Sequence, residues 1–342
     1  MNRFYPLGKL PAEHLARLLA RYAPDDPAVV LGPGVGRDAA VIDLGERYLI
    51  AKTDPITFAT DEIGWYAVHV NANDVACTGA APRWFLATLL LPGGKTDAPL
   101  VNEIFEQIDA ACNDLGISLV GGHTEITHGL DRPIVVGQML GQVAPERLVR
   151  PSGARPGDRL ILTKGIAVEG TAIIAREIVS GWDEANGGSE VSREVVARSR
   201  DFLHDPGISV VRDAAVATAT GDVHAMHDPT EGGVATGLWE LAEAAGVGMV
   251  IDEAALPILP ETRVLCRPLG MDPLGLIASG ALLLAVAPED DEPICAALAE
   301  EAIDAWLIGR VAQPERGRIL QTNEGERPLP RFDRDEIARL FE

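Results

Sequence analysis

Apolar and polar positions alternate regularly through the first half of the chain and mark out its elements. The segments AAVIDL and RYLIAKT predict two strands that turn at Leu44-Gly45-Glu46, as in a hairpin. The stretch 61–82 predicts a helix that ends near Gly79 and Pro82. Further strands are predicted at WFLATLLL, ISLV and RPIVVGQMLGQVA, and further helices near 11–22 and over 98–115.

The pattern resumes after RPSGARPGD (150–158), whose glycines and prolines make it the best candidate for a linker. Strands are predicted at RLILTK, DVHAM, VGMVID, GALLLAVAPE and AWLIGRVA, and helices from 166, at EGGVATGLWELAEAAG and at EPICAALAEEA. The stretch 181–192 predicts a mobile surface loop. We therefore expect two α+β domains, 1–152 and 153–342, each with a mostly antiparallel or mixed sheet covered by helices on one side.

Composition excludes several classes of protein. Of the 342 residues, 47% are hydrophobic and 23% are charged, as in a folded globular protein. The net charge of −22 argues against a nucleic acid or an anionic membrane as partner, because binding either requires a basic surface. There is no secretory signal, no CxxC pair and no apolar run near the ~18 residues of a membrane span, so we expect a cytoplasmic protein.

Four carboxylates stand inside or at the ends of apolar elements, where burial is costly unless a cation compensates them. Asp38 opens a strand after GPGVGR, and Asp54 follows the next strand. Asp74 lies in the helix segment NANDVA with Asn71 on the same face, and Glu125 follows a glycine pair. Converging acids of this kind would form a hard-oxygen site suited to Mg²⁺. The alternative is that each is an ordinary strand-end or exposed helix residue.

The segment HAMHDPTEGG offers a second piece of such a site. A predicted strand delivers Asp228, Thr230 follows in a turn, and Gly232 and Gly233 open a long helix. Free N–H groups at a helix start attract phosphate, and glycine lets the anion approach closely. The alternative is a helix capped by the threonine, with glycines that serve tight packing.

No GxxxxGK[ST] loop and no strand–GxGxxG–helix occurs, so ATP would have to bind by another architecture. Lys164 ends the strand RLILTK and could reach a phosphate, or it could be a surface lysine whose stem packs on the strand. A zinc site is a rival reading of the histidines, although their spacing does not match HExxH. That site would draw on His123, His128, His224, His227, Glu125 and Asp228.

Seven collinear segments resemble the AIR synthase (PurM-like) superfamily over about 36–310: GRDAAVI, TDP, NANDVACTGAAP, GGHTE, GDRLILTKG, HDPTEGG and DPLGLIASGALLLAVAP. The second-half segments are most similar to HypE-type hydrogenase maturation factors. The resemblance implies an N-terminal α/β domain whose strands pair with those of a second subunit in a dimeric β-barrel. It also implies a C-terminal α+β domain with a mixed sheet and helices on one side, and ATP with Mg²⁺ in a cleft partly across the dimer interface.

The resemblance also assigns roles at the matching motifs. It implies contacts to Mg²⁺ and phosphate for Asp38, Asp54, Asp74 and Asp228. The candidate catalytic residues are Asp54, Asp228 and Lys164. The turn from Gly121 to Thr124 would wall the nucleotide pocket, with Glu125 in support. The candidate nucleotide-binding residues are Gly36, Thr53, Asn73, Gly121, Gly122, His123, Thr124, Thr230, Gly232 and Gly233.

The chain departs from its relatives at three places. Arg37 stands beside Asp38 where many relatives have two acids. Glu231 follows DPT where HypE-type proteins have arginine or a similar residue. HypE-type proteins end in a cysteine that carries a carbamoyl group, whereas no cysteine follows Cys295 here.

These inferences predict an ATP- and Mg²⁺-dependent enzyme that activates a small amide- or carboxylate-type substrate by phosphoryl transfer. It would act as a homodimer on a small-molecule substrate, with a hydrogenase-maturation protein as a further partner. One alternative is a nucleotide-binding regulatory protein that has lost catalysis, which Glu231 and the missing terminal cysteine favour. The other is the zinc hydrolase built on histidines.

Overall fold

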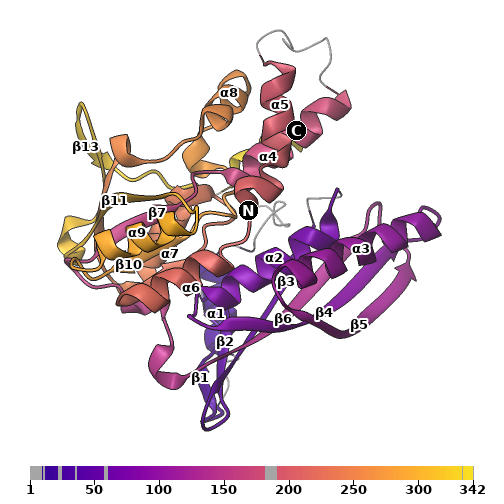
Figure 1. Ribbon diagram of the computed structural model, residues 1–342, viewed down its shortest axis with the longest axis horizontal. Helices are drawn as coiled ribbons and strands as arrows, with labels where there is room; N and C mark the ends of the chain where they lie inside the picture. The colour runs from indigo at the N-terminus through magenta and orange to yellow at the C-terminus, as the bar shows by residue number, and fades with distance from the viewer. Residues whose placement is uncertain are drawn as a thin grey trace.

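The computed structural model describes residues 10, 12–21, 25–34, 37–57, 61–181, 191–332 and 334–341. The candidate Gly36 and most of the predicted loop 181–192 lie outside the described residues. Each half of the chain forms one sheet with its helices (Figure 1). Among the described helices, none combines the length and the apolar content that crossing a bilayer requires.

The N-terminal half is a mixed sheet with two helices packed on one face. Its elements are α1 (Ala12–Arg21), β1 (Val29–Leu31), β2 (Ala40–Asp43), β3 (Tyr48–Ile56), α2 (Ile63–Ala76), β4 (Ala81–Pro92), α3 (Ala98–Asp114), β5 (Ser118–Thr127) and β6 (Ile134–Val143). The strand order is β1-β2-β3-β6-β4-β5, and β4 and β5 are its parallel pair. α2 and α3 lie side by side over this sheet (Figure 1). The strands and helices predicted here are confirmed, but β3 extends to Ile56, so Asp54 lies inside it.

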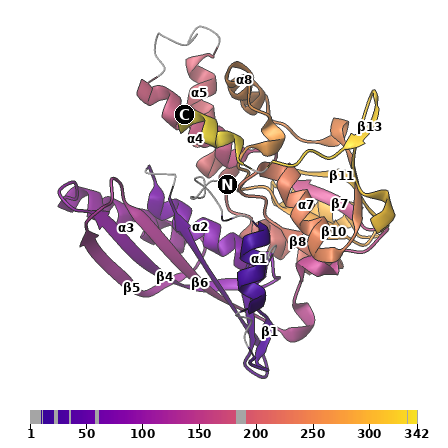
Figure 2. The ribbon, with the colours of Figure 1, turned by 180° about the vertical axis from the view of Figure 1, so that it is seen from behind.

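The glycine pair Gly121-Gly122 lies within a strand. β5 continues to Thr127 at the free edge of the sheet (Figure 2). A Cβ at Gly122 would lie 2.0 Å from the carbonyl oxygen of Ala87 in β4, so only glycine allows this approach of the two strands. The predicted turn from Gly121 to Thr124 is therefore wrong: these residues continue β5, and Gly122 serves the close strand pairing.

The C-terminal half is a mixed sheet with helices on both faces. Its elements are β7 (Arg159–Thr163), α4 (Val168–Gly181), α5 (Arg193–Asp201), α6 (Val211–Thr220), β8 (Val223–His227), α7 (Gly233–Ala245), β9 (Gly248–Asp252), α8 (Pro260–Leu269), β10 (Leu283–Val286), α9 (Asp291–Glu300), β11 (Ala305–Ala312), β12 (Arg318–Thr322) and β13 (Gly325–Pro328). The strand order is β13-β12-β9-β11-β7-β10-β8, and β9 and β12 run parallel. The two sheets lie on either side of 144–158, which contains the predicted domain boundary.

Alternate side chains of β7 point to opposite faces of the sheet, and helices cover both faces. Leu160 and Leu162 pack in a cluster with α4, α7 and α8, whereas Ile161 packs in a second cluster with α6 and α9. β10 is buried along its whole length, as expected for a strand with both faces covered. The prediction of helices on one side is therefore wrong for the C-terminal half, because its central strands are apolar on both faces.

α2 joins the two halves of the chain. Nearly all of its residues are buried, including Asn71, Asn73 and Asp74, so these polar side chains require partners inside the protein. Asn73 donates from Nδ2 to the carbonyl of Ile208 and accepts at Oδ1 from the N–H of Val210, both at 2.8 Å. The prediction that Asn73 binds nucleotide is corrected: its amide is fully buried and fastens α2 to the C-terminal half.

The variant Asn73→Ala tests this link. It is expected to lower the free energy of unfolding by about 2–4 kcal/mol, because the Val210 N–H and the Ile208 carbonyl remain buried without partners. Urea denaturation followed by circular dichroism measures the change. Asn113→Ala removes an exposed hydrogen bond to Asp109 and should cost less than about 0.5 kcal/mol. Equal stability of the two variants would contradict the role of Asn73.

Candidate nucleotide and metal site

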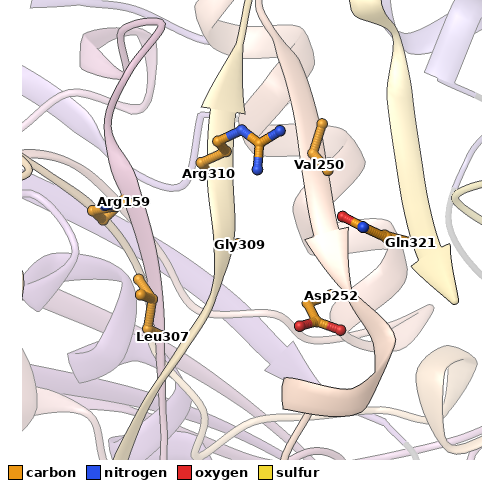
Figure 3. A pocket seen from close by; sticks show the side chains of 7 residues that line it. All are labelled: Arg159, Val250, Asp252, Leu307, Gly309, Arg310 and Gln321. Atoms are coloured by element: carbon orange, nitrogen blue, oxygen red, sulfur yellow. The ribbon is translucent and has the colours of Figure 1, made fainter. Parts of the chain in front are cut away.

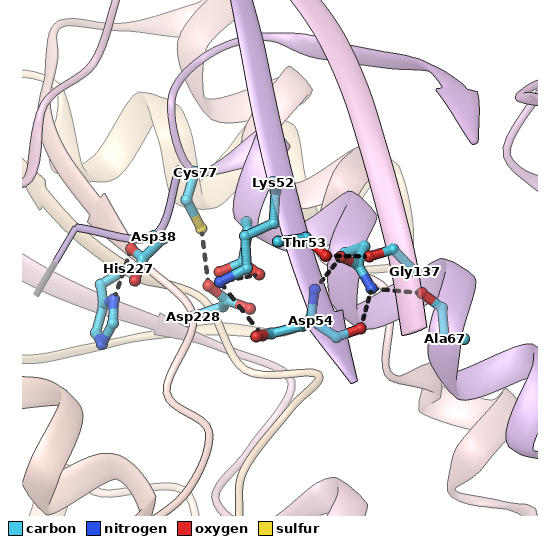
Figure 4. Close-up of polar contacts among 11 residues, drawn as sticks. Asp38, Lys52, Thr53, Asp54, Ala67, Cys77, Gly137, His227 and Asp228 are labelled. Carbon is cyan, nitrogen blue, oxygen red and sulfur yellow. Dashed lines mark hydrogen bonds and ion pairs between the residues drawn. The ribbon is translucent and has the colours of Figure 1, made fainter. Parts of the chain in front are cut away.

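Lys52 lies at the centre of the candidate site. Its ammonium nitrogen is 3.2 Å from Oδ2 of Asp54 and 3.0 Å from Oδ2 of Asp74. Lys52 and Asp54 are two residues apart in β3, so their side chains point to the same face of the strand. α2 packs against β3 and brings Asp74 to that face. Figure 4 shows Lys52 directed toward Asp54 and Asp228.

Asn71 fixes the backbone of Asp54. The Asp54 N–H donates to Oδ1 of Asn71 at 2.8 Å, and Nδ2 of Asn71 donates to the Asp54 carbonyl at 3.3 Å and to the Ala67 carbonyl at 2.8 Å (Figure 4). The side chain of Asp54 remains 40% exposed. The carboxylate is therefore held on a rigid strand and still faces solvent.

A histidine ties the two halves together at the same place. His227 ends β8 and lies buried, with Nδ1 3.1 Å from Oδ2 of Asp38 and Nε2 3.0 Å from Oε2 of Glu240 in α7. Asp38 comes from the N-terminal half, two residues before β2, so this contact crosses between the halves. Figure 4 shows Asp38 and His227 facing one another.

Asp228 adds a buried carboxylate beside them. The thiol of Cys77, at the end of α2, donates to Oδ1 of Asp228 at 3.4 Å (Figure 4). Within the described part of the chain, Oδ2 of Asp228 has no hydrogen-bond partner, although the residue is 2% exposed. An acceptor buried in this way is costly unless something supplies a donor or a positive charge.

Burial and mutual repulsion raise the pKa values of the two buried acids. Burial raises the pKa of Asp74 well above its usual value, Lys52 opposes that rise, and Asp228 and Asp38 add to it. Burial and the charge of Asp38 raise the pKa of Asp228 to about 7. Both carboxyl groups would become better ionised if a further cation entered the cluster.

Neighbouring carboxylates raise the pKa values of the two cationic side chains, Lys52 and His227, despite their burial. Burial would lower the pKa of Lys52, but the charges of Asp74, Asp54 and Asp38 outweigh it and raise the pKa. Burial would likewise lower the pKa of His227, and its two carboxylate partners raise that pKa well above the usual value. Both groups are therefore positively charged at neutral pH and still leave the cluster short of positive charge.

The donor atoms suit a divalent cation. Asp38, His227 and Asp228 each offer an atom within 4.8 Å of the others. Both ring nitrogens of His227 already contact carboxylates, so the oxygens are the available ligands. Carboxylate oxygens are the ligands that Mg²⁺ prefers. The residues present thus fit the ion that the sequence implies.

The structure brings together all four predicted aspartates: Asp38, Asp54, Asp74 and Asp228. Their role as ligands stays a prediction. Lys52, Cys77 and Glu240 were not predicted from the sequence to join this cluster, and His227 was predicted only as a zinc ligand. Lys52 carried a signal, since it is one of four lysines in the chain and stands in KTDP. The other three are ordinary in sequence, because their contacts depend on the fold.

Two residues predicted for the nucleotide site, Lys164 and Thr53, make contacts outside the aspartate cluster. Lys164 is buried and paired with Asp213 at 3.3 Å, and it also donates to the carbonyl of Ser209. Burial lowers its pKa, and Asp213 partly restores it. Lys164 therefore forms a buried ion pair, and its catalytic role stays a prediction. Thr53 points to the opposite face of β3 from Lys52 and donates to the Gly137 carbonyl of β6 at 2.9 Å (Figure 4).

The start of α7 is already supplied with an anion. The N–H of Gly232 donates to Oδ2 of Asp335 at 2.6 Å, and the carbonyl of Thr230 accepts from the N–H of Gly233 at 3.0 Å. The N–H of Ile277 donates to Oδ1 of Asp335 at 3.2 Å. The prediction of a free N–H at Gly232 for phosphate is thus wrong, and the threonine does not cap the helix either.

The residues Gly121 to Thr124 do not reach the acid cluster within one chain. β5 is three strands away from β3, about 14 Å at the usual strand spacing. These residues line a pocket of about 380 Å³ at the sheet edge, together with Phe105 and Leu119. His123 and Glu125 are exposed and lie 3.6 Å apart. The predicted nucleotide wall is therefore separate from the aspartates in a single chain.

The four histidines of the rival zinc site do not converge. His224 contacts Asp158 at 2.9 Å and Asp222 at 3.1 Å, whereas His123 lies on β5. The metal-type group found among the described residues contains His227 alone of the four. The histidine-based zinc hydrolase therefore lacks its ligand set, because His123 and His128 lie in or just after β5 of one sheet, whereas His224 and His227 lie in β8 of the other.

A smaller hollow of about 180 Å³ lies on the C-terminal sheet, away from the cluster. Figure 3 shows Arg310, Asp252 and Gln321 around it, on the neighbouring strands β11, β9 and β12. None of the four aspartates lines this hollow. It therefore adds nothing to the candidate site.

Comparisons with known proteins match both halves of the chain. Residues 36–143 match the N-terminal domain of AIR synthase related proteins, and residues 155–320 match the C-terminal domain. Carbamoyl dehydratase HypE of Cupriavidus necator is 32% identical over 295 residues, covering 84% of this chain and 79% of that protein. A putative hydrogenase expression/formation protein of Methanocaldococcus jannaschii is 30% identical over 312 residues, covering 89% and 88%.

A solved structure agrees with the same fold. The crystal structure of hydrogenase maturation protein HypE in complex with ATP has a TM-score of 0.68 and 26% sequence identity. The comparison covers 98% of each chain. The similarity thus extends over both sheets and over all four aspartates.

The variant Lys52→Met tests the electrostatics of the cluster. Without the ammonium group, the buried acids lose their central cation, and the free energy of unfolding should fall by about 3–5 kcal/mol. Mg²⁺ should then raise the melting temperature more in the variant than in the wild type, since the ion supplies the missing charge. Thermal unfolding with and without Mg²⁺ measures both effects.

Lys95→Met is the matched control, because Lys95 pairs with Asp131 at the surface, where the loss should be below about 1 kcal/mol. If Mg²⁺ stabilised Lys52→Met no more than the wild type, the cluster would not be the place where the ion binds.

Proposed function

The chain belongs to the family of AIR synthase related proteins, and on that basis we propose that it is an ATP- and Mg²⁺-dependent enzyme. The proposed reaction is phosphoryl transfer to an oxygen of a small amide- or carboxylate-type substrate. The observation that carries the proposal is the gathering of Asp38, Asp54, Asp74 and Asp228 around Lys52. A triphosphate with its metal needs such a preorganised set of charges.

Each residue of the cluster has a role that follows from its position. Mg²⁺, when bound, would neutralise the triphosphate, and the four aspartates would hold it. Asn71 keeps Asp54 fixed, and the pairing of His227 with Asp38 holds that carboxylate toward Asp228. Lys52 keeps the acids together before nucleotide arrives, so little reorganisation is needed on binding. Positioning and charge stabilisation are the main contributions expected in phosphoryl transfer.

The relatives support the chemical class. The Cupriavidus protein is named as a carbamoyl dehydratase, and the HypE crystal structure contains ATP. Removal of water from an amide is driven when ATP converts the oxygen into a leaving group, which fits transfer to an amide oxygen. A hydrogenase-maturation protein is proposed as the partner, because both relatives named above carry hydrogenase-related or HypE names.

A homodimer is part of the proposal, with β5 at its interface. Leu119, Val120 and Ile126 of this edge strand are 39–61% exposed, and Phe105 of α3 is exposed beside them. An apolar, unpaired edge strand is a ready site for pairing with another chain. Pairing at β5 alone would place His123 and Thr124 of the second chain one strand further from the aspartates than those of the same chain. We propose that the two sheets curl into the β-barrel inferred from the family, and that this closure brings His123 and Thr124 of the second chain toward the aspartates.

The variant Asp54→Asn tests the catalytic role of the cluster. Loss of one charge next to the metal and the triphosphate should lower kcat/KM for ATP turnover by at least about 100-fold. The fold should persist, because the backbone of Asp54 keeps its hydrogen bonds to Asn71. Steady-state phosphate release measures turnover, and size-exclusion chromatography checks the assembly.

Asp131→Asn serves as the control, since Asp131 is an exposed acid of the same domain. Undiminished turnover in Asp54→Asn would remove its assigned role. A wild-type protein that binds ATP but releases no phosphate with any metabolite tested would favour the regulatory alternative.

Mixed dimers test whether β5 of one chain completes the site of the other. Asp54→Asn and His123→Ala homodimers should both be strongly impaired. Co-refolding them in equal amounts should restore about one quarter of the wild-type activity, because half of the dimers then contain one intact site. Activity that stays at the level of the parents, in samples shown to contain mixed dimers, would place the whole site within one chain.

A further inference from the structure

The hollow of about 180 Å³ on the C-terminal sheet is lined by an arginine that lacks a carboxylate partner. The chain has 51 acidic and 29 basic residues, so its cations are expected to find carboxylates, as Arg316 and Arg327 do. Arg310 of β11 forms no ion pair with any residue that the structure describes. A guanidinium left in this state beside a cavity is able to bind an oxyanion.

The strand register places the residues of the hollow on one face of the sheet. Arg310 lies directly opposite Arg159 of β7 on one side and Val250 of β9 on the other. Asp252 comes two residues after Val250, and Gln321 of β12 lies opposite Asp252. Side chains that lie opposite one another, or two residues apart in a strand, point to the same face. The hollow is therefore built on paired strands.

Arg159 directs Arg310 away from β7. Like charges that lie directly opposite in a sheet repel each other. Arg159 is engaged on its other side by Asp291 at the start of α9, with Nε 3.5 Å from Oδ2. Figure 3 shows the guanidinium of Arg310 in the space between β11 and β9. Its charge consequently faces the hollow.

Asp252 gives the hollow a second charge of opposite sign. Oδ1 of Asp252 accepts from the N–H of Ala254 at 3.0 Å, which leaves Oδ2 for another donor. Figure 3 shows Arg310 and Asp252 toward opposite ends of the hollow, with the amide of Gln321 directed toward β9 between them. Arg310 and Asp252, both in the described part of the chain, form no ion pair with each other. A cation and an anion held apart across one cavity match a ligand that carries both charges.

Apolar side chains complete the lining. Val250 is 2% exposed and Leu307 of β11 is 43% exposed, and both line the hollow. They offer a surface for an aliphatic group beside the two charges. The hollow is smaller than the pockets that hold drug-sized ligands and cofactors, so it suits a small molecule better than a nucleotide.

We propose that this hollow binds a free aliphatic α-amino acid. The guanidinium of Arg310 donates to the carboxylate, Oδ2 of Asp252 accepts from the ammonium group, and the side chain lies against Val250 and Leu307. A simple carboxylate would leave Asp252 without a donor, and a simple amine would leave Arg310 without an anion. Recognition therefore requires both charges of the zwitterion.

L-Valine, N-acetyl-L-valine and L-valinamide are matched probes of this site. They share one side chain, but the acetyl group removes the ammonium charge and the amide removes the carboxylate charge. Ligand-observed NMR on the full-length protein should show saturable binding of L-valine and at least about tenfold weaker binding of each analogue. Only signal that L-valine displaces is counted, because a net charge of −22 attracts the ammonium group of L-valinamide in general.

Two variants assign the two charges separately. Arg310→Gln should remove the preference for L-valine over L-valinamide. Asp252→Asn should remove the preference for L-valine over N-acetyl-L-valine, and its amide oxygen can still accept from the N–H of Ala254. Arg83→Gln and Asp131→Asn are the matched controls, since they change exposed charges of the N-terminal half and should keep both preferences. Circular dichroism confirms that each variant is folded.

Three results would overturn the proposal. They are the absence of saturable binding of L-valine, binding of either analogue as tight as that of L-valine, and both preferences surviving in Arg310→Gln. The last result would place the amino acid elsewhere on the protein. None of the four aspartates lines the hollow, so ATP turnover and amino-acid binding can fail independently of each other.

Discussion

The structure depends on one electrostatic constraint. Four buried or half-buried carboxylates repel one another, and the ammonium group of Lys52 offsets that repulsion. The carboxylates of Asp54 and Asp74 lie 3.2 Å and 3.0 Å from the ammonium nitrogen of Lys52. Without that charge between them, they would repel one another and move apart. Even with Lys52 and His227 charged, Asp228 keeps a raised pKa and an oxygen without a partner among the described residues. The fold therefore holds a cluster that is stable but still attracts a cation.

α2 makes this cluster possible because it is buried on every side and lies between the two sheets. Asn71 and Asp74 face β3, and Asn73 fastens the helix to the C-terminal half. The site consequently forms only when the two halves are docked. A polar residue lost from this helix would disturb both the docking of the halves and the position of the charges.

Much of the architecture followed from sequence, but contacts between distant segments did not. The periodicity located the strands around Asp38 and Asp54. Carboxylates in apolar surroundings correctly suggested that Asp38, Asp54 and Asp74 gather, whereas Glu125, predicted on the same ground, lies exposed on β5. The end of β5 was predicted too early, at Gly121-Gly122. Glycine is common in turns, but it also allows two strands to approach closely, as Gly122 does here. The contacts of Lys164, Gly232 and Asn73 were not predicted, because their partners lie far away in the sequence. Those partners are Asp213, Asp335 and Ile208 with Val210.

The most direct measurement is a crystal structure with Mn²⁺ and a non-hydrolysable ATP analogue, in which anomalous scattering locates the metal. If the four aspartates hold the ion, the metal peak is coordinated by the phosphates and by oxygens from among Asp38, Asp54, Asp74 and Asp228. A peak bound elsewhere, with these carboxylates still paired only to Lys52 and His227, would contradict it.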